Sequence, residues 1–372
     1  MICALAAGDS VWHRAIATED LVIPGRFVVG ACQNPGRPRR RVMPCAARKE
    51  DAATYTVVEL CGGGGGLALG LESAGFQHIA VIEIDPDACR TLRSNRSAWP
   101  VVQEDVRKVD ARPFYGVDLV AGGVPCPPFS IAGKQLGEGD ERDLFPAALR
   151  IIRVARPRAI FLENVPGLAT TKFRTYLGEI LDELRRLGYV AGWRVLNASD
   201  FGVPQSRPRF LLVGVRRGAG TPFRWPTGDA TPRAVGDTLY DLMAARGWPG
   251  AHAWRMAACA TAPTIVGGSK KHGGADLGPT RSRQRWAELH VEGISIADQA
   301  PDETFPIAEA PRLTTQMVAR IQGFPDSWQF AGRKTAVYRQ IGNALPPPVA
   351  EAVGRAIIQA IAVPARGPCG CS

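Results

Sequence analysis

The sequence predicts an α/β protein with a doubly wound, mostly parallel sheet and a second, smaller domain. Residues 55 to about 216 alternate between short apolar runs and stretches with helical spacing, the pattern of a sheet covered by helices on both faces. A run of five glycines, Gly62 to Gly66, separates the first apolar run from the first helical stretch. From 217 to about 310 the alternation stops and Gly, Pro, Trp and basic residues take its place, so we expect the second domain there.

The first predicted elements are a buried strand over residues 56–61 and a helix over 67–75, with the glycines between them. Glycines let the backbone approach a ligand closely, and the start of a helix offers free N–H groups. Strand, glycine loop and helix in this order are typical of a nucleotide-binding unit, although a tight turn gives the same local pattern. Gly63, Gly65 and Gly66 are therefore candidate ligand contacts.

An acidic residue follows each of the next two predicted strands. The run 79–82 ends at Glu83, about 20 residues beyond the glycines, where a carboxylate accepts hydrogen bonds from ribose hydroxyls in this type of unit. Val101 and Val102 lead to Asp105, which is placed to bind an adenine amino group. The alternative for both acids is a helix N-cap or a solvated strand end.

The next predicted strand, 117–121, leads through two glycines to Pro125 and Cys126. Pro127 restricts Cys126 to extended conformations, and the prolines leave the loop little freedom. Such a loop presents the thiol of Cys126 as a nucleophile, whereas a cysteine in an ordinary turn acts as a small apolar residue.

Two further stretches carry polar residues toward the same region. The apolar run 159–162 delivers Glu163 into a turn, at the end of a strand where ligands of α/β sheets bind. Gln205, Arg207 and Arg209 precede the apolar run 210–215, and in an extended chain they share one face. Two guanidiniums and an amide suit phosphate or carbonyl recognition, although an ordinary basic strand edge has the same pattern.

In this order the motifs resemble those of the cytosine-C5 DNA methyltransferases of bacterial type, which use S-adenosylmethionine. The resemblance covers roughly residues 55 to 360 and rests on the glycine loop 59–66, Glu83, Asp105, Pro125-Cys126, Glu163-Asn164-Val165, Gln205 with Arg207 and Arg209, Arg312-Leu313-Thr314, the run 322–326 and the run 340–344. The chain departs from the family at Cys61, where phenylalanine usually stacks on the adenine, and at Pro127, where glutamine is common.

The resemblance implies a Rossmann-like methyltransferase sheet and a covalent mechanism. The thiolate of Cys126 would add to C6 of a flipped-out cytosine, with Glu163 hydrogen-bonding the ring and Arg207 and Arg209 supplying positive charge beside it, assisted by Gln205. The cofactor would be held by Cys61, Gly63, Gly65, Gly66, Glu83, Asp105, Pro125 and Asn343. No metal is required.

Composition agrees with a polyanionic partner. Lys and Arg exceed Asp and Glu by 45 to 35, giving a net charge of +10. No apolar run is long enough to span a membrane, and residues 1–7 lack the basic start of a secretory signal, so we expect a cytoplasmic protein. The nine cysteines are scattered without paired metal-ligand spacing, and we expect no disulfide framework in a chain of this kind.

These anchors divide the chain into five parts. We expect a largely disordered extension over 1–53, a catalytic and cofactor-binding domain over 54–216, a target-recognition domain over 217–310, motifs returning to the catalytic domain over 311–363, and a flexible tail over 364–372. In the recognition segment the candidates for contact with DNA are basic, namely Lys270, Lys271, Arg281, Arg283 and Arg285.

The sequence thus predicts a monomeric DNA (cytosine-5-)-methyltransferase acting on double-stranded DNA, without a stable partner complex, as the modification half of a restriction-modification pair. Arginine-rich recognition weakly favours a GC-rich site. Three alternatives remain open. An amino methyltransferase would need Asn, Asp or Ser where Cys126 stands. An RNA cytosine-5 methyltransferase shares the catalytic motifs, and a non-catalytic DNA-binding regulator would show no cofactor-dependent turnover.

Overall fold

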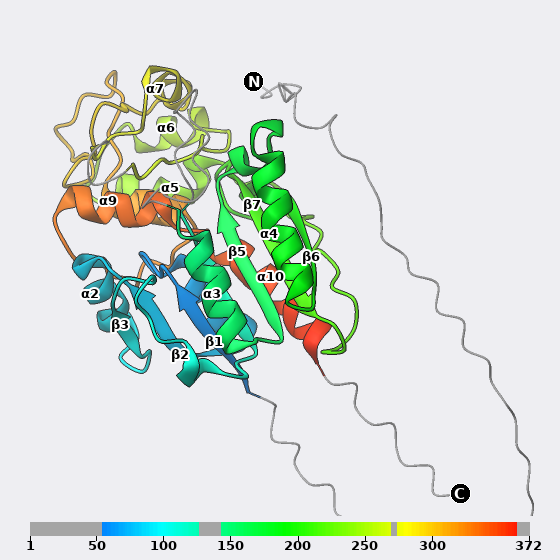
Figure 1. The fold of residues 1–372 in the computed structure, drawn as a ribbon. Helices are drawn as coiled ribbons and strands as arrows, with labels where there is room; N and C mark the ends of the chain where they lie inside the picture. The colour runs from blue at the N-terminus through cyan, green and yellow to red at the C-terminus, as the bar shows by residue number, and fades with distance from the viewer. Residues whose placement is uncertain (1–53, 126–142, 269–273, 363–372) are drawn as a thin grey trace, which may run out of the picture. The chain divides into compact units, whose positions relative to one another are not determined.

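A seven-stranded sheet forms the centre of the molecule, in the order β3-β2-β1-β4-β5-β7-β6 (Figure 1). The computed structural model describes residues 54–125, 143–268 and 274–362. Neighbouring strands pair in parallel from β3 to β5, while β7 runs antiparallel to both β5 and β6. The strands are β1 (Tyr55–Leu60), β2 (Phe76–Glu83), β3 (Val101–Gln103), β4 (Leu119–Gly123), β5 (Ala159–Asn164), β6 (Tyr189–Asn197) and β7 (Pro208–Arg216). The predicted Rossmann-like α/β sheet is confirmed.

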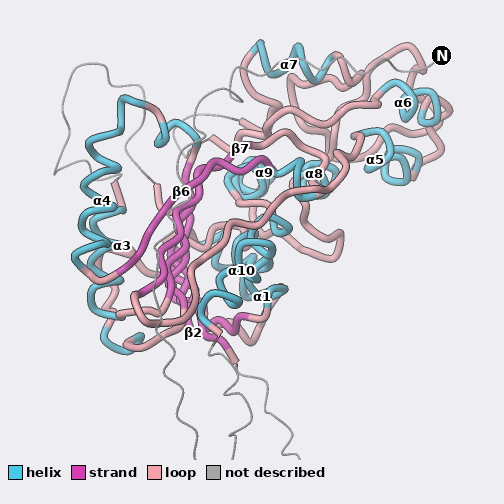
Figure 2. The backbone as a smooth tube through the Cα atoms, turned by 90° about the vertical axis from the view of Figure 1, so that its right-hand side faces the viewer, coloured by secondary structure: helices cyan, strands magenta, loops and turns pink. Residues whose placement is uncertain are grey.

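Helices cover both faces of this sheet. Figure 2 shows α3 (Phe145–Ala155) and α4 (Arg174–Arg186) on one face and α1 (Gly66–Ala74) and α10 (Pro347–Ile361) on the other. Successive strand residues point to opposite faces, so Val57 packs into the core beneath α1 and α10 while Val58 packs into the core beneath α3 and α4. Because both of their faces are buried, β1, β4, β5 and β7 are nearly continuous apolar runs, which is why the sequence pattern identified them. The edge strand β6 is only partly buried and was not predicted.

The parallel arrangement brings the ends of several strands to one edge. β1 ends at Leu60, β2 at Glu83, β4 at Gly123 and β5 at Asn164. Between β1 and α1 lies the glycine loop, and α2 (Pro86–Asn95) begins just after Glu83 with Asp85 as its N-cap. The carboxyl edge of the sheet therefore collects the polar residues that the sequence placed after its apolar runs.

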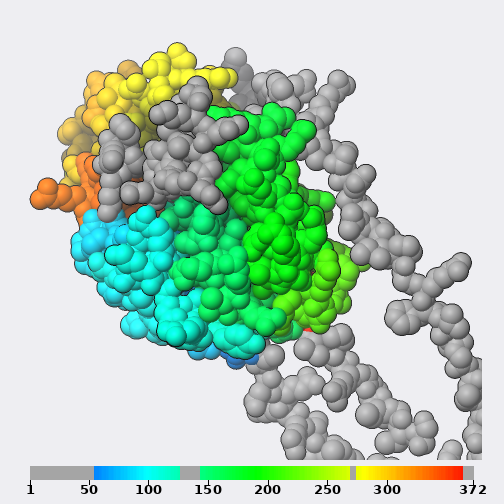
Figure 3. Space-filling view, in the orientation of Figure 1, coloured from blue at the N-terminus to red at the C-terminus, as the bar shows by residue number. Residues whose placement is uncertain are grey.

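Residues 217–310 contain short helices joined by long loops. The helices are α5 (Val235–Ala244), α6 (Ala251–Ala257) and α7 (Thr280–Ala287). In Figure 3, residues of this segment, in yellow, lie at the upper end of the visible face of the molecule. Their apolar core, with Trp248, Trp254 and Trp286, continues into α8 (Thr315–Ile321) and α9 (Lys334–Asn343). The segment begins directly after β7, where the sequence predicted a boundary, but its core is shared with the rest of the chain, so a separate domain stays a prediction.

The C-terminal helix α10 returns to the glycine loop and packs closely on α1. A Cβ on Gly70 of α1 would lie 2.4 Å from the carbonyl oxygen of Pro347, and one on Gly354 of α10 would lie 2.8 Å from the Cβ of Ala74. Only glycine at these two positions permits such an approach of the helices. The segment leading into α10 is thereby held against the first βα unit.

Candidate active site and cofactor pocket

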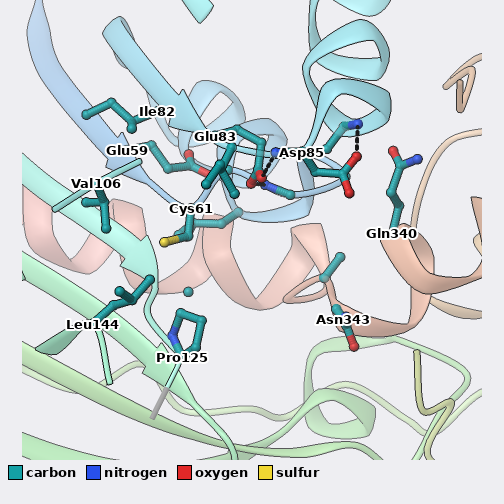
Figure 4. Close-up of a pocket in the computed structure, with 18 of the residues that line it drawn as sticks. Glu59, Cys61, Ile82, Glu83, Asp85, Val106, Pro125, Leu144, Gln340 and Asn343 are labelled. Carbon is teal, nitrogen blue, oxygen red and sulfur yellow. Dashed lines mark hydrogen bonds between the residues drawn. The ribbon is translucent and has the colours of Figure 1, made fainter. Parts of the chain in front are cut away.

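A cavity of about 600 Å³ opens at the carboxyl edge of the sheet. Its walls come from the ends of β1, β2, β4 and β5, the residues after β3, and the segment 339–345 (Figure 4). The lining includes Glu59, Cys61, Gly62, Gly63, Gly64, Gly66, Glu83, Asp85, Asp105, Pro125, Glu163, Arg339, Gln340 and Asn343. Its volume is in the range of small-molecule and cofactor sites.

The glycine loop is tied to Glu83. The backbone N–H of Gly63 donates to Oε2 of Glu83 at 2.7 Å, and the N–H of Asp85 donates to Oε1 at 2.7 Å. Gly63 has φ +53°, a left-handed conformation that favours glycine. The carboxylate that the sequence assigned to ribose recognition is thus held in place by the two loops beside it, and it lines the cavity.

One glycine of the predicted set does not face the cavity. Gly65, at φ +87°, lies against the indole of Trp328, where a Cβ would come within 2.6 Å of Cζ2. Gly62 and Gly64 line the cavity together with Gly63 and Gly66. The structure thus places Gly65 against Trp328, where the absence of a Cβ lets the loop pack on the indole.

Trp328 itself was missed by the sequence reasoning. Its Nε1 donates to the carbonyl oxygen of Gly64 at 3.1 Å, and the indole is 5 % exposed. The guanidinium of Arg96 lies over this ring and over that of Trp99, 5.5 and 5.9 Å from the ring centroids. These aromatic and cationic side chains form the outer support of the glycine loop.

A second missed residue is His78 on β2. Its Nε2 lies 3.1 Å from Oε2 of Glu59, and both side chains are fully buried. Nδ1 of His78 has no hydrogen-bond partner among the described residues. Burial raises the pKa of Glu59, although the hydrogen bond from His78 lowers it in part. A carboxyl group is therefore fixed at the floor of the cavity by a neighbour 19 residues along the chain.

Cys61 is the one non-glycine residue of this loop with a left-handed backbone, at φ +57°. Figure 4 shows its sulfur on the side of the cavity that carries Leu144 and Pro125. Burial, with the nearby carboxylates of Glu83 and Glu59, raises the pKa of the thiol far above its usual range. Cys61 therefore stays protonated and lines the cavity as a small apolar group.

Asp105 also lines the cavity, as predicted from its place after β3. Its carboxylate is engaged by Arg107, whose Nη2 lies 2.6 Å from Oδ2 and whose backbone N–H donates to Oδ1 at 2.9 Å. Hydrogen bonds from Arg107 lower the pKa of Asp105. The ionised acid is thus available on the cavity wall as an acceptor, with Arg107 as a neighbour that the sequence did not suggest.

Glu163 reaches the cavity from the end of β5, and Arg209 lies beside it. The Nε of Arg209 is 3.2 Å from Oε1 of Glu163, and both side chains are almost buried. Burial raises the pKa of Glu163, while Arg209 and, more weakly, Arg207 lower it. The opposing effects leave a carboxyl group that accepts a proton more readily than a solvated one, held at a defined position.

Gln205 and Arg207 are placed differently from the prediction. Both are fully buried and neither lines the cavity. Arg207 donates to the backbone carbonyls of Ile265 (2.6 Å), Gly342 (2.5 Å) and Ala344 (3.0 Å). Gln205 accepts from the N–H of Ile265 at 2.9 Å and donates to Oε1 of Gln322 at 2.8 Å.

The carbonyl groups that Arg207 binds belong to the protein backbone and not to a ligand. Gln205 and Arg207 join the start of β7 to the segment before residue 268 and to the segment that follows α9. A direct catalytic contact is therefore corrected to a supporting role: the two residues position the wall formed by Gly342 to Leu345. Their common face was predicted, but their partners lie too far along the chain for the pattern to show.

The C-terminal part of α9 closes the cavity. Asn343 lines it and donates from Nδ2 to the carbonyl oxygen of Gly268 at 3.1 Å. Gln340, next to it on the wall, accepts from Oγ1 of Thr91 at 2.6 Å and so joins α9 to α2. Arg339 lies 3.4 Å from Oδ2 of Asp85. The motif 340–344 quoted from the sequence was sufficient to find Asn343, but it did not indicate Arg339.

Pro125 stands at the cavity rim, immediately before Cys126. Nδ2 of Asn164 donates to the carbonyl oxygen of Val124 at 2.7 Å, and the N–H of Leu144 donates to that of Pro125 at 3.1 Å. Cys126 itself lies outside the described residues. Its attachment point is thus fixed beside the end of β5, which carries Glu163.

The candidate DNA contacts are only partly described. Lys270 and Lys271 lie outside the described residues, and Arg281, Arg283 and Arg285 are on α7. Arg281 and Arg285 are exposed, whereas Arg283 is half-buried against Gly293. The structure places these three arginines on a helix anchored by the buried ring of Trp286, and their contact with DNA stays a prediction.

In the described ranges, no group of three or more His, Cys, Asp and Glu residues is arranged to hold a metal ion. Across those same ranges, no helix has the length and apolar character needed to span a membrane.

Comparison with known proteins agrees with this geometry. The family model for C-5 cytosine-specific DNA methylases matches residues 55–359. The chain is 54 % identical over 315 residues to the Type II methyltransferase M.NaeI of Lentzea aerocolonigenes, covering 84 % of this chain and 76 % of that protein. It is 50 % identical over 311 residues to the Type II methyltransferase M.NgoMIV of Neisseria gonorrhoeae, and this alignment covers 82 % of this chain and 98 % of that protein.

Solved structures show the same fold. A DNA modification methyltransferase described as encoded within an E. coli prophage superposes with a TM-score of 0.61 at 23 % identity, covering 83 % of this chain and 99 % of that one. With the family model spanning most of the sequence, and two relatives at 50 % identity or more, the chain belongs to the C-5 cytosine-specific DNA methylase family.

Proposed function

We propose that the protein is a DNA (cytosine-5-)-methyltransferase that transfers a methyl group from S-adenosylmethionine to C5 of a flipped-out cytosine in duplex DNA. This proposal rests on one observation: residues suited to the cofactor and residues suited to the cytosine line the same cavity. Glu163, paired with Arg209, lies at the same cavity as the glycine loop and Glu83, and Pro125 stands on its rim directly before Cys126.

The residues of the cavity fit the cofactor. Glu83 and Asp105 offer carboxylate acceptors suited to hydroxyl and amino groups, and the glycine loop permits a close backbone approach. Glu59 adds a carboxyl group near the loop that can accept a hydrogen bond from an ammonium group, while Asn343 closes the opposite wall. When bound there, the cofactor would supply an electrophilic methyl group.

The chemistry on the cytosine requires a nucleophile and an acid. The thiolate of Cys126 would add to C6, which makes C5 nucleophilic, and Glu163 would hydrogen-bond the ring and stabilise its protonated form during the addition. The raised pKa of Glu163 suits this role. After methyl transfer, loss of the C5 proton and elimination of the thiolate would regenerate Cys126. Arg209 would hold Glu163 in position.

We propose further that the recognition segment reads a DNA sequence related to the targets of the two relatives that are 54 % and 50 % identical to this chain. The two alignments cover 84 % and 82 % of the chain. The residues outside 217–310 make up a smaller share of the chain than this, so each alignment includes at least part of the recognition segment. As a Type II modification enzyme it would act as a monomer in the cytoplasm, where its DNA substrate lies, with a cognate restriction endonuclease as a partner in function but not in a stable complex.

The test is bisulfite sequencing of DNA from a methylation-free host expressing the protein, with Cys126→Ala as the matched control. Protection from conversion at one short motif in the wild type alone would establish the reaction and the target. The two relatives expressed in parallel show whether the motif is shared. Absence of protection with soluble wild-type protein would contradict the proposal and favour an RNA substrate or a non-catalytic role.

A further inference from the structure

Four arginines surround a second cavity, of about 250 Å³, between the ends of α3 and α4. The lining consists of Ile152, Arg153, Arg156, Arg186, Leu187, Tyr189 and Arg216. None of these residues belongs to the motifs that identify the family, and none takes part in the chemistry described above. Arg153, Arg156 and Arg186 are exposed and Arg216 is half-buried, so the guanidinium groups surround the cavity at the protein surface.

This arginine pocket lies at the end of the sheet opposite the cofactor cavity. Arg156 precedes β5, Arg216 ends the antiparallel β7, and Tyr189 begins β6, opposite Arg216. Glu163 lies near the far end of β5, about 13 Å from its first residue Ala159 at about 3.3 Å for each residue. In Figure 1, α3 and α4 run from the upper to the lower part of this face, so their C-terminal ends lie away from α5, α6 and α7.

The positive charge of the pocket is only partly compensated. Glu183 pairs with Arg153 at 2.6 Å and also with Arg186. The C-termini of α3 and α4 each contribute roughly half a negative charge. Against four guanidiniums this leaves about two positive charges for which the described residues offer no further ion pair.

Arg156 has a backbone that disfavours an arginine. It is the C-cap of α3 in the left-handed conformation, at φ 49° and ψ 52°. Glycine is the usual residue at such a position, because a Cβ crowds the following carbonyl oxygen in the left-handed conformation. An arginine held in this conformation at the mouth of a cationic cavity indicates that its side chain serves a purpose other than stability.

The polar groups around the cavity are fixed by the backbone. Nη1 of Arg216 donates to the carbonyl oxygen of Arg156 at 3.2 Å, and the hydroxyl of Tyr189 donates to that of Pro157 at 2.7 Å. Burial raises the pKa of Tyr189 to about 12, and Arg216 and Arg156 act in the opposite direction because both lie near the hydroxyl. Both arginines therefore lie near this hydroxyl and line the same cavity.

We propose that this arginine pocket binds a phosphate group. Guanidinium forks match the geometry of phosphate oxygens, and a dianion would neutralise the excess charge. The volume suits one or two phosphate units. The phosphate has two possible sources with the same chemistry, a free anion such as pyrophosphate or a phosphodiester of duplex DNA outside the catalytic cleft, and the experiment distinguishes them.

The first measurement is calorimetric titration of the full chain with pyrophosphate at low salt. The variants are Arg156→Asn, which tolerates the left-handed backbone, and the same change combined with Arg216→Gln. The matched control is Arg185→Gln, which removes an exposed arginine of α4 that pairs with Asp182 outside the pocket. We expect the double variant to bind at least about tenfold more weakly and the control to bind within about twofold of the wild type.

The variant Arg156→Gly distinguishes a loss of the binding site from a loss of folding. This change relieves the strained backbone, so it should raise Tm by about 2 °C while weakening pyrophosphate binding. The salt dependence of binding to a duplex of about 30 base pairs then identifies the source. A slope reduced by about 1 to 2 in the double variant indicates DNA phosphates, because each contributes about 0.9. An unchanged slope with weakened pyrophosphate binding indicates a free anion.

The proposal is overturned if the wild type gives no binding heat with pyrophosphate and the duplex slope is unchanged in the double variant. It is equally overturned if Arg185→Gln weakens binding as much as the pocket variants, because the effect would then be one of general surface charge. Neither result bears on methyl transfer, which is measured separately.

Discussion

The indole Nε1 of Trp328 donates a hydrogen bond to the carbonyl oxygen of Gly64, although 264 residues separate them in the chain. The bond joins the loop before α9 to the centre of the glycine loop, and the ring occupies the space that a side chain at residue 65 would fill. The cofactor loop is therefore shaped from outside by a residue of the C-terminal part of the chain.

Replacing Trp328 by Phe should weaken cofactor binding about fivefold, because the ring packing is largely kept while the hydrogen bond, of about 1 kcal/mol, is lost. Calorimetry with S-adenosylmethionine measures the effect. Trp193→Phe is the matched control, since Trp193 stacks on Phe210 away from the cavity. Equal affinities for the two variants would show that the bond to Gly64 does not shape the loop.

Replacing Arg207 by Lys should lower the free energy of unfolding by about 3 kcal/mol, because one ammonium group cannot reach the carbonyls on both sides of the guanidinium. Denaturant unfolding followed by circular dichroism measures the loss. Arg112→Lys, at an exposed ion pair with Asp110, should leave the free energy of unfolding unchanged within the error of the measurement. A direct catalytic role for Arg207 would instead give a stable but inactive variant.

Replacing Glu59 by Gln should change how stability depends on pH. Burial raises the pKa of Glu59, so its contribution to stability is fully present below its ordinary pKa of 4.5 and is lost as pH rises through the raised value. The variant lacks this titration but keeps a partner for His78. Tm of the variant relative to the wild type should therefore increase from pH 4 to pH 8. A difference independent of pH would contradict the raised pKa.

Removing residues 1–52 should leave kcat/KM within about twofold of the full chain. The family match begins at residue 55 and the sheet at Tyr55, so the catalytic and cofactor residues are all retained. Methylation of a substrate plasmid by the purified truncated protein gives the measurement. An inactive but folded truncation would show that the removed segment takes part in catalysis or in DNA binding.

Much of the fold followed from local pattern. The strands are apolar because both faces are buried, and the carboxyl-edge rule then placed Glu83, Asp105 and Glu163 at one cavity without knowledge of their contacts. The pattern also gave Gln205 and Arg207 a common face. It could not say that this face turns into the protein, because that depends on Gly342 and Ala344, more than a hundred residues later.

The sequence did not reveal His78 and Trp328 for the same reason. His78 and Trp328 resemble ordinary core residues in the sequence, and their function in the pocket arises only from tertiary contact with Glu59 and Gly64. Gly65 was assigned to the cofactor because a glycine run does not reveal which members face a ligand and which face a neighbouring side chain. Only the position of the indole separates the two cases.

The packing of α10 on α1 has a consequence for biosynthesis. The first βα unit leaves the ribosome early, but the wall formed by residues 339–345 follows about 280 residues later, which at roughly 5–20 residues per second is a delay of about 15 to 55 seconds. Until then the glycine loop lacks Trp328, Gln340 and the returning helix. The nascent chain should therefore be unable to retain its methyl donor, and the enzyme would begin to modify the genome only after its C-terminal helix has been synthesised.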